Sequence, residues 1–410
     1  MKHSYYITLC FFLLAHAAPI AAYNPKHNTF CTFKNTKTKS DSLNFDWRGF
    51  AKIEKNGAFF LIDLFGQEYK LSSDIRKLDN TITALDLSGR DLKTLPEVVL
   101  QQKQLQVLLL DNNQLTSLPN NFVDLQNLTT LYLYGNKLVV LPENFSKLKG
   151  LKILKLNANK LTTLPKNLEA LQDLNTLDLS NNLIKTLGNN FGELKNLVTL
   201  NLGFNQITAL PTNFGALKNL VTLHLNSNKL TVLPVNFGKL ANATALDLSD
   251  NKLTALPTNF GELQNLKRLF LHSNELTVLP TNFVELKNLT TLHLKFNQIT
   301  VLPKGFGALK NLHVLDLFEN QLIALPNDIG ELKNLKELDL RSNRLTYLPN
   351  NFCALKNLIS LDLRANEITY LPNNFCALEN LISLDLPKTI SVQSIENVKK
   401  QLPKCNYIVQ

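Results

Sequence analysis

The sequence lacks the short motifs that mark common catalytic and phosphate-binding sites. It contains no GxxxxGK, HExxH, GxSxG or CxxC pattern. These spacings respectively cradle a phosphate, bind zinc from one helix face, present a nucleophilic serine and pair redox-active thiols. The absence of all four argues against an enzyme. We therefore expect no catalytic residue, no metal site and no cofactor.

Concentrated charge is absent as well. Lys and Arg exceed Asp and Glu by 43 to 33, but the sequence contains no run of five or more basic residues. Nucleic-acid-binding proteins gather their basic residues into a patch or a stripe. An excess that is spread along the whole chain predicts no nucleic-acid partner.

Long apolar stretches are missing apart from one at the N-terminus. A short basic start precedes an apolar run over residues 5–15, and small residues continue as far as Ala17 and Ala22. The run is shorter than the roughly 20 residues of a membrane span, and Pro19 lies just beyond it. This pattern predicts a cleavable signal peptide over residues 1–22, with a retained signal anchor as the alternative. After cleavage we expect a protein that is secreted or held at the cell surface or in the periplasm, without stable membrane insertion.

Repetition is what the sequence has in abundance. Asparagine recurs every 23 residues from Asn113 to Asn366, and the unit around it reads L-x-x-L-x-L-x-x-N-x-L-x-x-L-P-x-x-F-x-x-L-x-N. The L-x-L alternation has the period of a β-strand. The Asn can turn the chain and bond neighbouring backbone groups, and the Pro fixes an extended bend. Phe fills its slot in ten units, which predicts a stacked apolar spine.

The unit resembles the leucine-rich repeat, in the 23-residue LPxxF class that is similar to Ras-group repeat proteins. The resemblance covers roughly residues 80–390. The GxIP sequence that is usual in plant extracellular repeats is absent. An intracellular-style repeat behind a signal peptide resembles the repeat proteins of host-associated bacteria.

The expected fold is an α/β solenoid, a leucine-rich-repeat horseshoe with a parallel concave β-sheet of about 14 strands. One unit cannot bury its own apolar face, so neighbours must stack and the two ends need caps. The predicted organisation is a signal peptide over 1–22, a polar leader and N-terminal β cap over 23–80, repeats over 81–390 and a C-terminal cap over 391–410.

Both caps have their own sequence signals. An Asn56-Gly57 turn between two apolar runs predicts a hairpin, and we expect a small β meander over the first repeat with Trp47 packed there. Near the C-terminus apolar residues recur at helical spacing: Val392, Ile395, Val398 and Leu402. Pro403 should stop this helix, and a closing strand can come after it.

Four cysteines remain after the signal peptide: Cys31, Cys353, Cys376 and Cys405. Three full pairings are possible, and the sequence does not choose among them. Cys353 and Cys376 fill the same slot of adjacent repeats, which is within disulfide reach. Equivalent side chains of adjacent repeats point the same way. We therefore favour two cysteines that only fill space as small apolar side chains over a disulfide bond between them.

The Leu, Asn, Pro and Phe residues of the repeat unit are needed for the fold. The remaining strand positions, six, four and two residues before each Asn, should face the concave side. Residues that the repeat does not require gather there on three neighbouring strands. This central patch comprises Arg268, Phe270, His272, His293, Lys295, Phe296 and Phe318. Exposed aromatic side chains beside cations are typical of interface centres, so we predict a partner-binding site. Drift in a duplicated array, which leaves isolated surface aromatics, is the alternative.

A second predicted contact site lies nearer the N-terminus, at Tyr132 and Tyr134 with Leu109 and Lys155. The two histidines of the central patch allow further interpretations. His272 and His293 could share a metal, but no third ligand of fixed spacing accompanies them; they could also tune binding through pH.

An acidic column follows the concave strands beyond the central patch. Asp residues recur from Asp316 to Asp385 beside Arg341 and Arg364. This arrangement predicts mutual charge compensation on the strand face, with electrostatic steering of a partner as the alternative.

Together these features predict an exported, monomeric, non-enzymatic module that binds a protein partner on its concave face, in host interaction or signalling. The alternative is a structural or surface-coat repeat protein without a dedicated partner.

Overall fold

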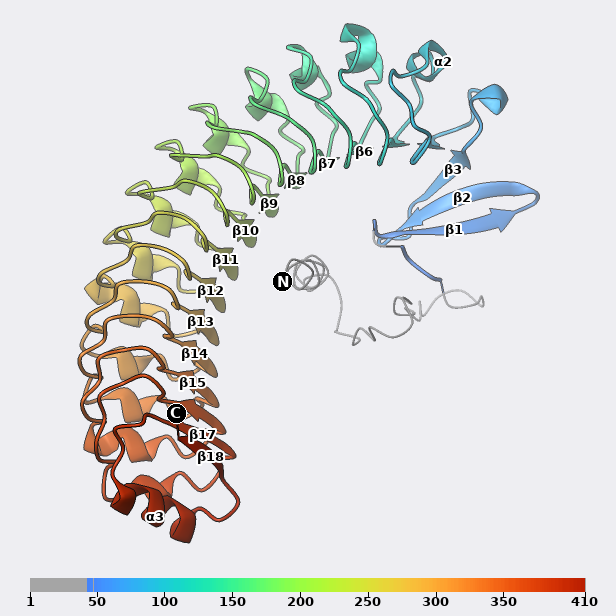
Figure 1. The fold of residues 1–410 in the computed structure, drawn as a ribbon. Coiled ribbons are helices and arrows are strands. Elements are labelled where there is room, and N and C mark those ends of the chain that lie inside the picture. The colour runs from blue at the N-terminus through green and yellow to red at the C-terminus, as the bar shows by residue number, and fades with distance from the viewer. Residues whose placement is uncertain (1–42, 47, 410) are drawn as a thin grey trace.

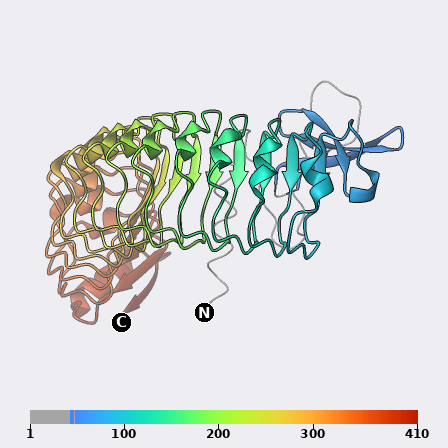
Figure 2. The same cartoon turned by 90° about the horizontal axis from the view of Figure 1, so that it is seen from above.

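The chain forms one curved array in which short strands line the inner side and helical turns the outer side (Figure 1). This computed structural model describes residues 43–409 except residue 47. Figure 2 shows the successive turns stacked side by side along the arc. The predicted signal peptide and polar leader, Cys31 and Trp47 lie outside the described residues, as does the side chain of Cys376.

Fourteen short strands, one for each repeat, form the inner face. Each strand pairs with the next in parallel and in register, so that Leu223 lies opposite Leu246 and Leu269 opposite Leu292. The strands are β4 Ala84–Asp86, β5 Val107–Leu109, β6 Thr130–Tyr132, β7 Ile153–Lys155, β8 Thr176–Asp178, β9 Thr199–Asn201, β10 Thr222–His224, β11 Ala245–Asp247, β12 Arg268–Phe270, β13 Thr291–His293, β14 Val314–Asp316, β15 Glu337–Asp339, β16 Ser360–Asp362 and β17 Ser383–Leu386. The predicted parallel sheet of about 14 strands is confirmed.

On the outer side, one helical turn follows each strand from β4 to β16. The turns are α2 Glu97–Leu100 and the 3₁₀ helices η2 Asn120–Asp124, η3 Phe145–Lys147, η4 Leu168–Ala170, η5 Phe191–Glu193, η6 Phe214–Ala216, η7 Phe237–Lys239, η8 Phe260–Glu262, η9 Thr281–Glu285, η10 Phe306–Ala308, η11 Ile329–Glu331, η12 Asn350–Ala354 and η13 Phe375–Ala377. The Phe residue of these turns is buried, and the rings of Phe214, Phe237 and Phe260 stack within 3° of parallel at 6.1–6.3 Å. The predicted apolar spine is confirmed.

The recurrent Asn forms a ladder that joins each repeat to the one before it. The Nδ2 amide of Asn136 donates to Leu110 O of the preceding repeat (2.9 Å) and to Leu133 O of its own repeat (3.1 Å), and its Oδ1 accepts from Leu115 N (3.0 Å). The same bonds recur as far as Asn366. Buried turns would otherwise leave backbone groups unpaired, so this Asn ladder explains the fixed 23-residue spacing.

The N-terminal cap is a β meander, as predicted. Strands β1 (Phe50–Lys55) and β2 (Ala58–Asp63) form an antiparallel hairpin, with Asn56 and Gly57 at positive φ in its turn. Strand β3 (Glu68–Ser72) is antiparallel to β2 and parallel to β4, and so it begins the inner sheet. A short turn, η1 (Ile75–Lys77), leads into the first repeat.

The C-terminal cap consists of helix α3 (Val392–Gln401) and strand β18 (Asn406–Val409), which pairs in parallel with β17. The expected apolar face of the helix is partly wrong, because Val392 is 71% exposed while Val398 is buried. Six residues turn a helix through about 240°, so Val392 lies about 120° around the helix from Val398, at the margin of the buried face. Ser394 is buried instead, and its hydroxyl accepts a hydrogen bond from Leu371 N at 3.2 Å.

Candidate functional site

One row of the central patch crosses three neighbouring strands. In-register pairing places Phe270, His293 and Asp316 side by side at the ends of β12, β13 and β14. The ring of Phe270 stacks on His293, with centroids 5.1 Å apart and planes 13° from parallel. His293 Nδ1 lies 3.3 Å from Asp316 Oδ2. The row therefore joins an aromatic face, an imidazole and a carboxylate.

A second row lies two residues further along each chain segment and includes Lys295, Phe318 and Arg341, with Phe296 directly after Lys295. The rings of Phe296 and Phe318 meet edge to face at 4.9 Å. Lys295 Nζ lies 6.0 Å from the Phe296 ring centroid and 3.9 Å from Asp316 Oδ2. The Arg341 guanidinium lies 4.1 Å over the Phe318 ring. The structure thus brings these predicted residues together and adds Arg341, which the sequence had assigned only to charge compensation.

Burial and charge set the protonation of this surface. Burial lowers the pKa of His272, against the opposing effect of Asp247 and Asp250, so its imidazole is neutral at pH 7. Burial alone would raise the pKa of Asp316, but hydrogen bonds from His293 and from Phe318 N outweigh it and lower that pKa. Asp316 is therefore a carboxylate that the patch itself holds in place.

The residue before each ladder Asn adopts a left-handed backbone conformation. Its φ lies near +52° to +67° along the array, and most repeats fill it with Gly, Ala, Ser, Asn or Asp. Phe204 and Phe296 are the bulky aromatic exceptions, and they are 45% and 41% exposed. A bulky residue there is strained, and somewhat less than half of each residue is exposed to solvent.

The second predicted contact site is not an exposed surface. Leu109 and Tyr132 are buried, at 0% and 3% exposure, because the N-terminal cap covers this end of the concave face. The Tyr132 hydroxyl donates to Arg48 O at 3.1 Å, and its ring meets Phe50 edge to face. Tyr134 is half-buried beside them. The expectation that Tyr132 and Leu109 form a contact surface on the concave face is corrected.

A lysine completes that second set. Lys155 Nζ lies 3.6 Å from Asp178 Oδ2, and its side chain is only 14% exposed. The structure therefore ties Lys155 to the neighbouring strand.

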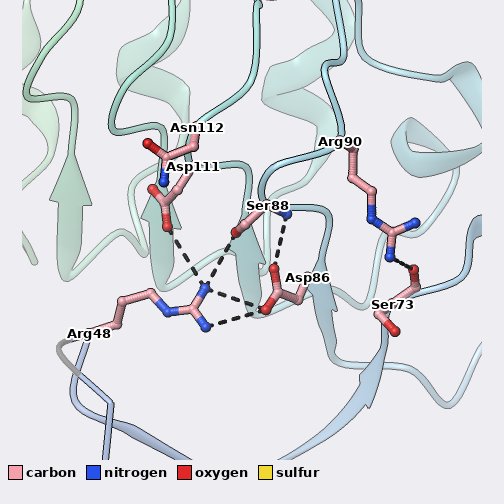
Figure 3. Close-up of a pocket in the computed structure, with 7 residues that line it drawn as sticks. All are labelled: Arg48, Ser73, Asp86, Ser88, Arg90, Asp111 and Asn112. Atoms are coloured by element: carbon pink, nitrogen blue, oxygen red, sulfur yellow. Dashed lines mark hydrogen bonds and ion pairs between the residues drawn. The ribbon is translucent and has the colours of Figure 1, made fainter. Parts of the chain in front are cut away.

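Arg48 fastens the cap to the first two repeats (Figure 3). Its guanidinium donates to Asp86 Oδ2 at 3.3–3.4 Å and to Ser88 Oγ at 3.4 Å, and it lies 3.9 Å from Asp111 Oδ2. A hollow of about 330 Å³ remains beside it, lined also by Ser73, Arg90 and Asn112. Burial raises the pKa of Asp111 to about 7, although the charge of Arg48 opposes this.

Sequence reasoning missed this use of Arg48. The sequence does contain an indication of it. Asp86 and Asp111 are predicted to face the concave side, but strands β4, β5 and β6 contain no Lys or Arg that could pair with them. Buried carboxylates need a charge partner, and that partner comes from the cap.

The charge compensation expected toward the C-terminus is present. Arg341 Nε lies 3.0 Å from Asp339 Oδ2, and Arg364 lies 2.5 Å from Asp362 Oδ2 and 3.7 Å from Asp385 Oδ2. Burial raises the pKa of Asp339 to about 6, with Arg341 opposing it.

Within residues 43–409, residue 47 apart, no three His, Cys, Asp or Glu side chains cluster in a way that suits a metal ion. In the same part of the chain, no helix has the length and apolar character to cross a bilayer.

Comparison with protein families matches most of the array. Residues 80–138, 149–207, 195–253 and 333–389 match a model described as "Leucine rich repeat", and together they make up more than half of the chain. Residues 236–338 match a second model, "Leucine-rich repeat region". No curated protein matches the chain.

Solved structures with the same architecture include proteins from distant sources. A leucine-rich-repeat protein of Leptospira interrogans is 35% identical with a TM-score of 0.67, over 83% of this chain and 99% of that one. A plant peptide hormone receptor in complex with RGF2 is 25% identical with a TM-score of 0.70, over 85% of this chain and 59% of that one. The TLR13–ssRNA13 complex is 32% identical with a TM-score of 0.63, over 76% of this chain and 48% of that one.

Proposed function

The chain belongs to the leucine-rich-repeat proteins, and from this premise we propose that it is an exported, non-enzymatic module that recognises a protein partner through its central patch. Leucine-rich-repeat domains commonly mediate protein–protein interaction, and the plant receptor similar to this chain is solved in complex with RGF2. The patch lies on the uncapped part of the concave face, where a partner has access. Host interaction or signalling is the setting that we propose for it.

Phe296 is the observation that carries the proposal. Its side chain is 41% exposed and its φ is +56°. The repeat imposes this left-handed backbone along the array, at a cost of roughly 1–2 kcal/mol for a residue with a side chain, and most repeats place a small or short polar residue there. Burial in the core does not offset that cost. A role in binding accounts for a ring that the fold does not need.

A triple substitution tests the site. Phe270→Ala, His293→Ala and Phe318→Ala together remove the rings of both rows while leaving the buried Leu positions untouched. The matched control replaces Val232, Val278 and Val301 by Ala, since these apolar residues are about half exposed and lie outside the concave strands. Far-ultraviolet circular dichroism should show both variants folded.

Photocrosslinking supplies the binding measurement. Benzoylphenylalanine placed at residue 296 should give a discrete protein adduct, whereas the same group at Val235, which is 87% exposed and lies outside the strands, should not. The triple variant should lose the adduct and the valine control should keep it. An adduct of undiminished yield in the triple variant would sink the proposed site, and a structural array without a partner would give no saturable adduct.

Export is a separate part of the proposal and has its own test. The basic start, apolar run and small residues of positions 1–22 support it. N-terminal sequencing of the exported product should find a chain that begins just after Ala17 or Ala22. A product that keeps Met1 and sediments with membranes would instead indicate a retained anchor.

A further inference from the structure

A hollow at the C-terminal end of the concave face has an unbalanced charge. It measures about 540 Å³ and is lined by Phe318, Arg341, Ser342, Arg364, Ala365, Asn366, Pro387, Lys388 and Thr389. Among these described residues are three cations and no Asp or Glu. The hollow at the N-terminal end differs, since its lining contains two Arg and two Asp. Charge therefore favours an anionic group in the C-terminal hollow.

The carboxylates near this hollow lie beneath the cations. The Arg341 side chain is 37% exposed and Asp339 26%, and the Arg364 side chain is 28% exposed and Asp362 13%. Toward the central patch, Lys295 is 36% exposed above Asp316 at 15%. In each of these ion pairs the cation is therefore the more exposed member, while Glu319 and Glu337 are exposed nearby.

Hydrogen bonds to the local backbone explain why the carboxylates are less exposed than the cations. In β15 and β16 the Asp Oδ1 accepts a hydrogen bond from the backbone N–H two residues later, from Arg341 N to Asp339 and from Arg364 N to Asp362, each at 3.1 Å. A short side chain held in this way cannot swing outward. Lys and Arg carry long stems that let the charged head reach solvent, so the order of charges results from the D-x-R spacing.

Apolar surface adjoins the cations. Phe318 lies under the Arg341 guanidinium at 4.1 Å and against Phe296 at 4.9 Å, and Pro387 lines the far side of the hollow. Aromatic rings beside Arg are typical of the centres of protein interfaces. The hollow and the central patch share Phe318, so one partner segment can contact both.

We infer that the partner presents an acidic segment to this face, with Asp or Glu in the C-terminal hollow and aromatic or aliphatic side chains on Phe318 and Phe296. This inference rests on the proposed function and specifies its partner. Complementary charge would raise the association rate and give the binding a salt dependence.

A peptide selection tests the inference without knowledge of the partner. Phage displaying random 12-residue peptides are selected on the purified full chain, and the enriched peptides are measured by fluorescence anisotropy. We expect enriched peptides with Asp or Glu next to Phe, Tyr, Trp or Leu. Their affinity should fall at least tenfold on Arg341→Gln/Lys388→Gln and should weaken with added NaCl.

A matched variant controls for net charge. Lys229→Gln/Lys252→Gln removes the same number of positive charges from two exposed residues on the edge of the array, and peptide affinity should stay within twofold. Thermal unfolding midpoints check that both double variants fold. Enriched peptides that are basic or uncharged, or that bind Arg341→Gln/Lys388→Gln at full strength, would overturn the inference.

Two outcomes separate this inference from its premise and from another ligand class. Peptides that need Phe270, His293 and Phe318 but carry no acidic residue would contradict the charge inference and leave the proposed function standing. Peptides that ignore both the triple and the double variant would contradict both. A fluorescein-labelled 20-residue oligouridylate that binds more tightly than any peptide, and loses binding on Arg341→Gln/Lys388→Gln, would assign the surface to single-stranded nucleic acid instead.

Discussion

The two ends of the concave face use the same repeat slot for opposite purposes. Leu109 and Tyr132, four residues before their ladder Asn, are buried beneath the N-terminal cap at 0% and 3% exposure. Phe270 and His293 hold the same slot in β12 and β13 and are only half-buried. The cap explains the burial of this slot at the N-terminal end, whereas in β8, β9 and β10 the slot is buried as well, at Asp178, Asn201 and His224.

The order of charges differs between the ends as well. At the capped end Arg48 is 15% exposed and lies between Asp111, at 1%, and the more exposed Asp86, at 24%, and Asp46, at 34%. At the open end the cations lie above the carboxylates. The same ion-pair chemistry fastens a cap at one end and presents positive charge at the other. Matched substitutions at the two ends, and a change of pH, can therefore separate the two uses.

The largest contrast should come from removing one ring at each end. Truncation of a buried aromatic residue costs about 3–5 kcal/mol, so Tyr132→Ala should lower the free energy of unfolding of the capped end by that amount. Phe270→Ala should cost less than about 1 kcal/mol, because a half-exposed side chain loses little burial. Hydrogen exchange of β1–β6 and of β11–β14 would give both values. Equal losses at the two sites would remove the distinction between capped and open ends.

The capped end should also weaken as pH rises. The pKa of Asp111 is about 7 in the fold, against an ordinary value of 3.8, so the folded chain holds a proton that the unfolded chain releases. Stability from this group is present near pH 4 and is lost as pH rises to 7, by on the order of 2–4 kcal/mol. Trp47, the only tryptophan and the neighbour of Arg48 in sequence, offers a local fluorescence signal for urea unfolding.

The pH dependence has a matched pair of variants. Asp111→Asn should abolish the loss between pH 4 and 7. Asp316→Asn should leave it in place, because the pKa of Asp316 is lowered in the fold and its stabilisation disappears only as pH falls below its ordinary value of 3.8. A wild-type chain whose capped end is equally stable at pH 4 and pH 7 would contradict this assignment of Asp111.

Breaking the ion pairs should lower the free energy of unfolding less than removing Tyr132 does. The loss should again be larger at the capped end than at the open end. Arg48→Met leaves Asp86 and Asp111 without their cation, and we expect a loss of about 2 kcal/mol, below the 3–5 kcal/mol of a fully buried pair. Arg341→Met should cost less than about 1 kcal/mol, as exposed pairs do. Proteolysis within residues 43–80 would report the first change. If the Arg48→Met variant resists proteolysis as well as the wild type, the cap is held by its apolar contacts alone.

Much of this architecture could be predicted from the sequence, because repetition makes local signals add up. The 23-residue spacing of Asn predicts the ladder, and L-x-L and the Phe column predict the strands and the spine. Each unit repeats the same bonds to its neighbour, so one correct unit gives the whole array. The hairpin at Asn56 and Gly57 and the terminal helix also carry their own signals.

Contacts between segments far apart in sequence could not be predicted in this way. Arg48 and Tyr132 are 84 positions apart, and no periodicity relates them. Assigning Tyr132 to a binding surface failed for this reason, since the strand pattern gives the face of a side chain but not what covers that face. The central patch was located because in-register strands make columns, whereas the place of Arg341 over Phe318 depends on side-chain conformation.

The smallest predicted effect separates strain from binding. Asn tolerates left-handed backbone, so Phe204→Asn should raise the free energy of unfolding by about 1 kcal/mol. Phe296→Asn relieves the same strain but also loses the edge contact with Phe318, which is worth about 0.5–1.5 kcal/mol. Its net change in stability should therefore be close to zero.

Partner affinity should behave differently at the two positions. Phe296→Asn should weaken crosslinked partner or selected peptide at least tenfold, because the ring belongs to the central patch, while Phe204→Asn, four repeats away, should leave affinity unchanged. Differential scanning calorimetry and anisotropy on the same preparations would give both readings. If both variants bind the partner with equal affinity, the ring at residue 296 is a chance substitution within the repeats. If only Phe296→Asn loses affinity, and its stability is unchanged, the strained ring is retained for recognition.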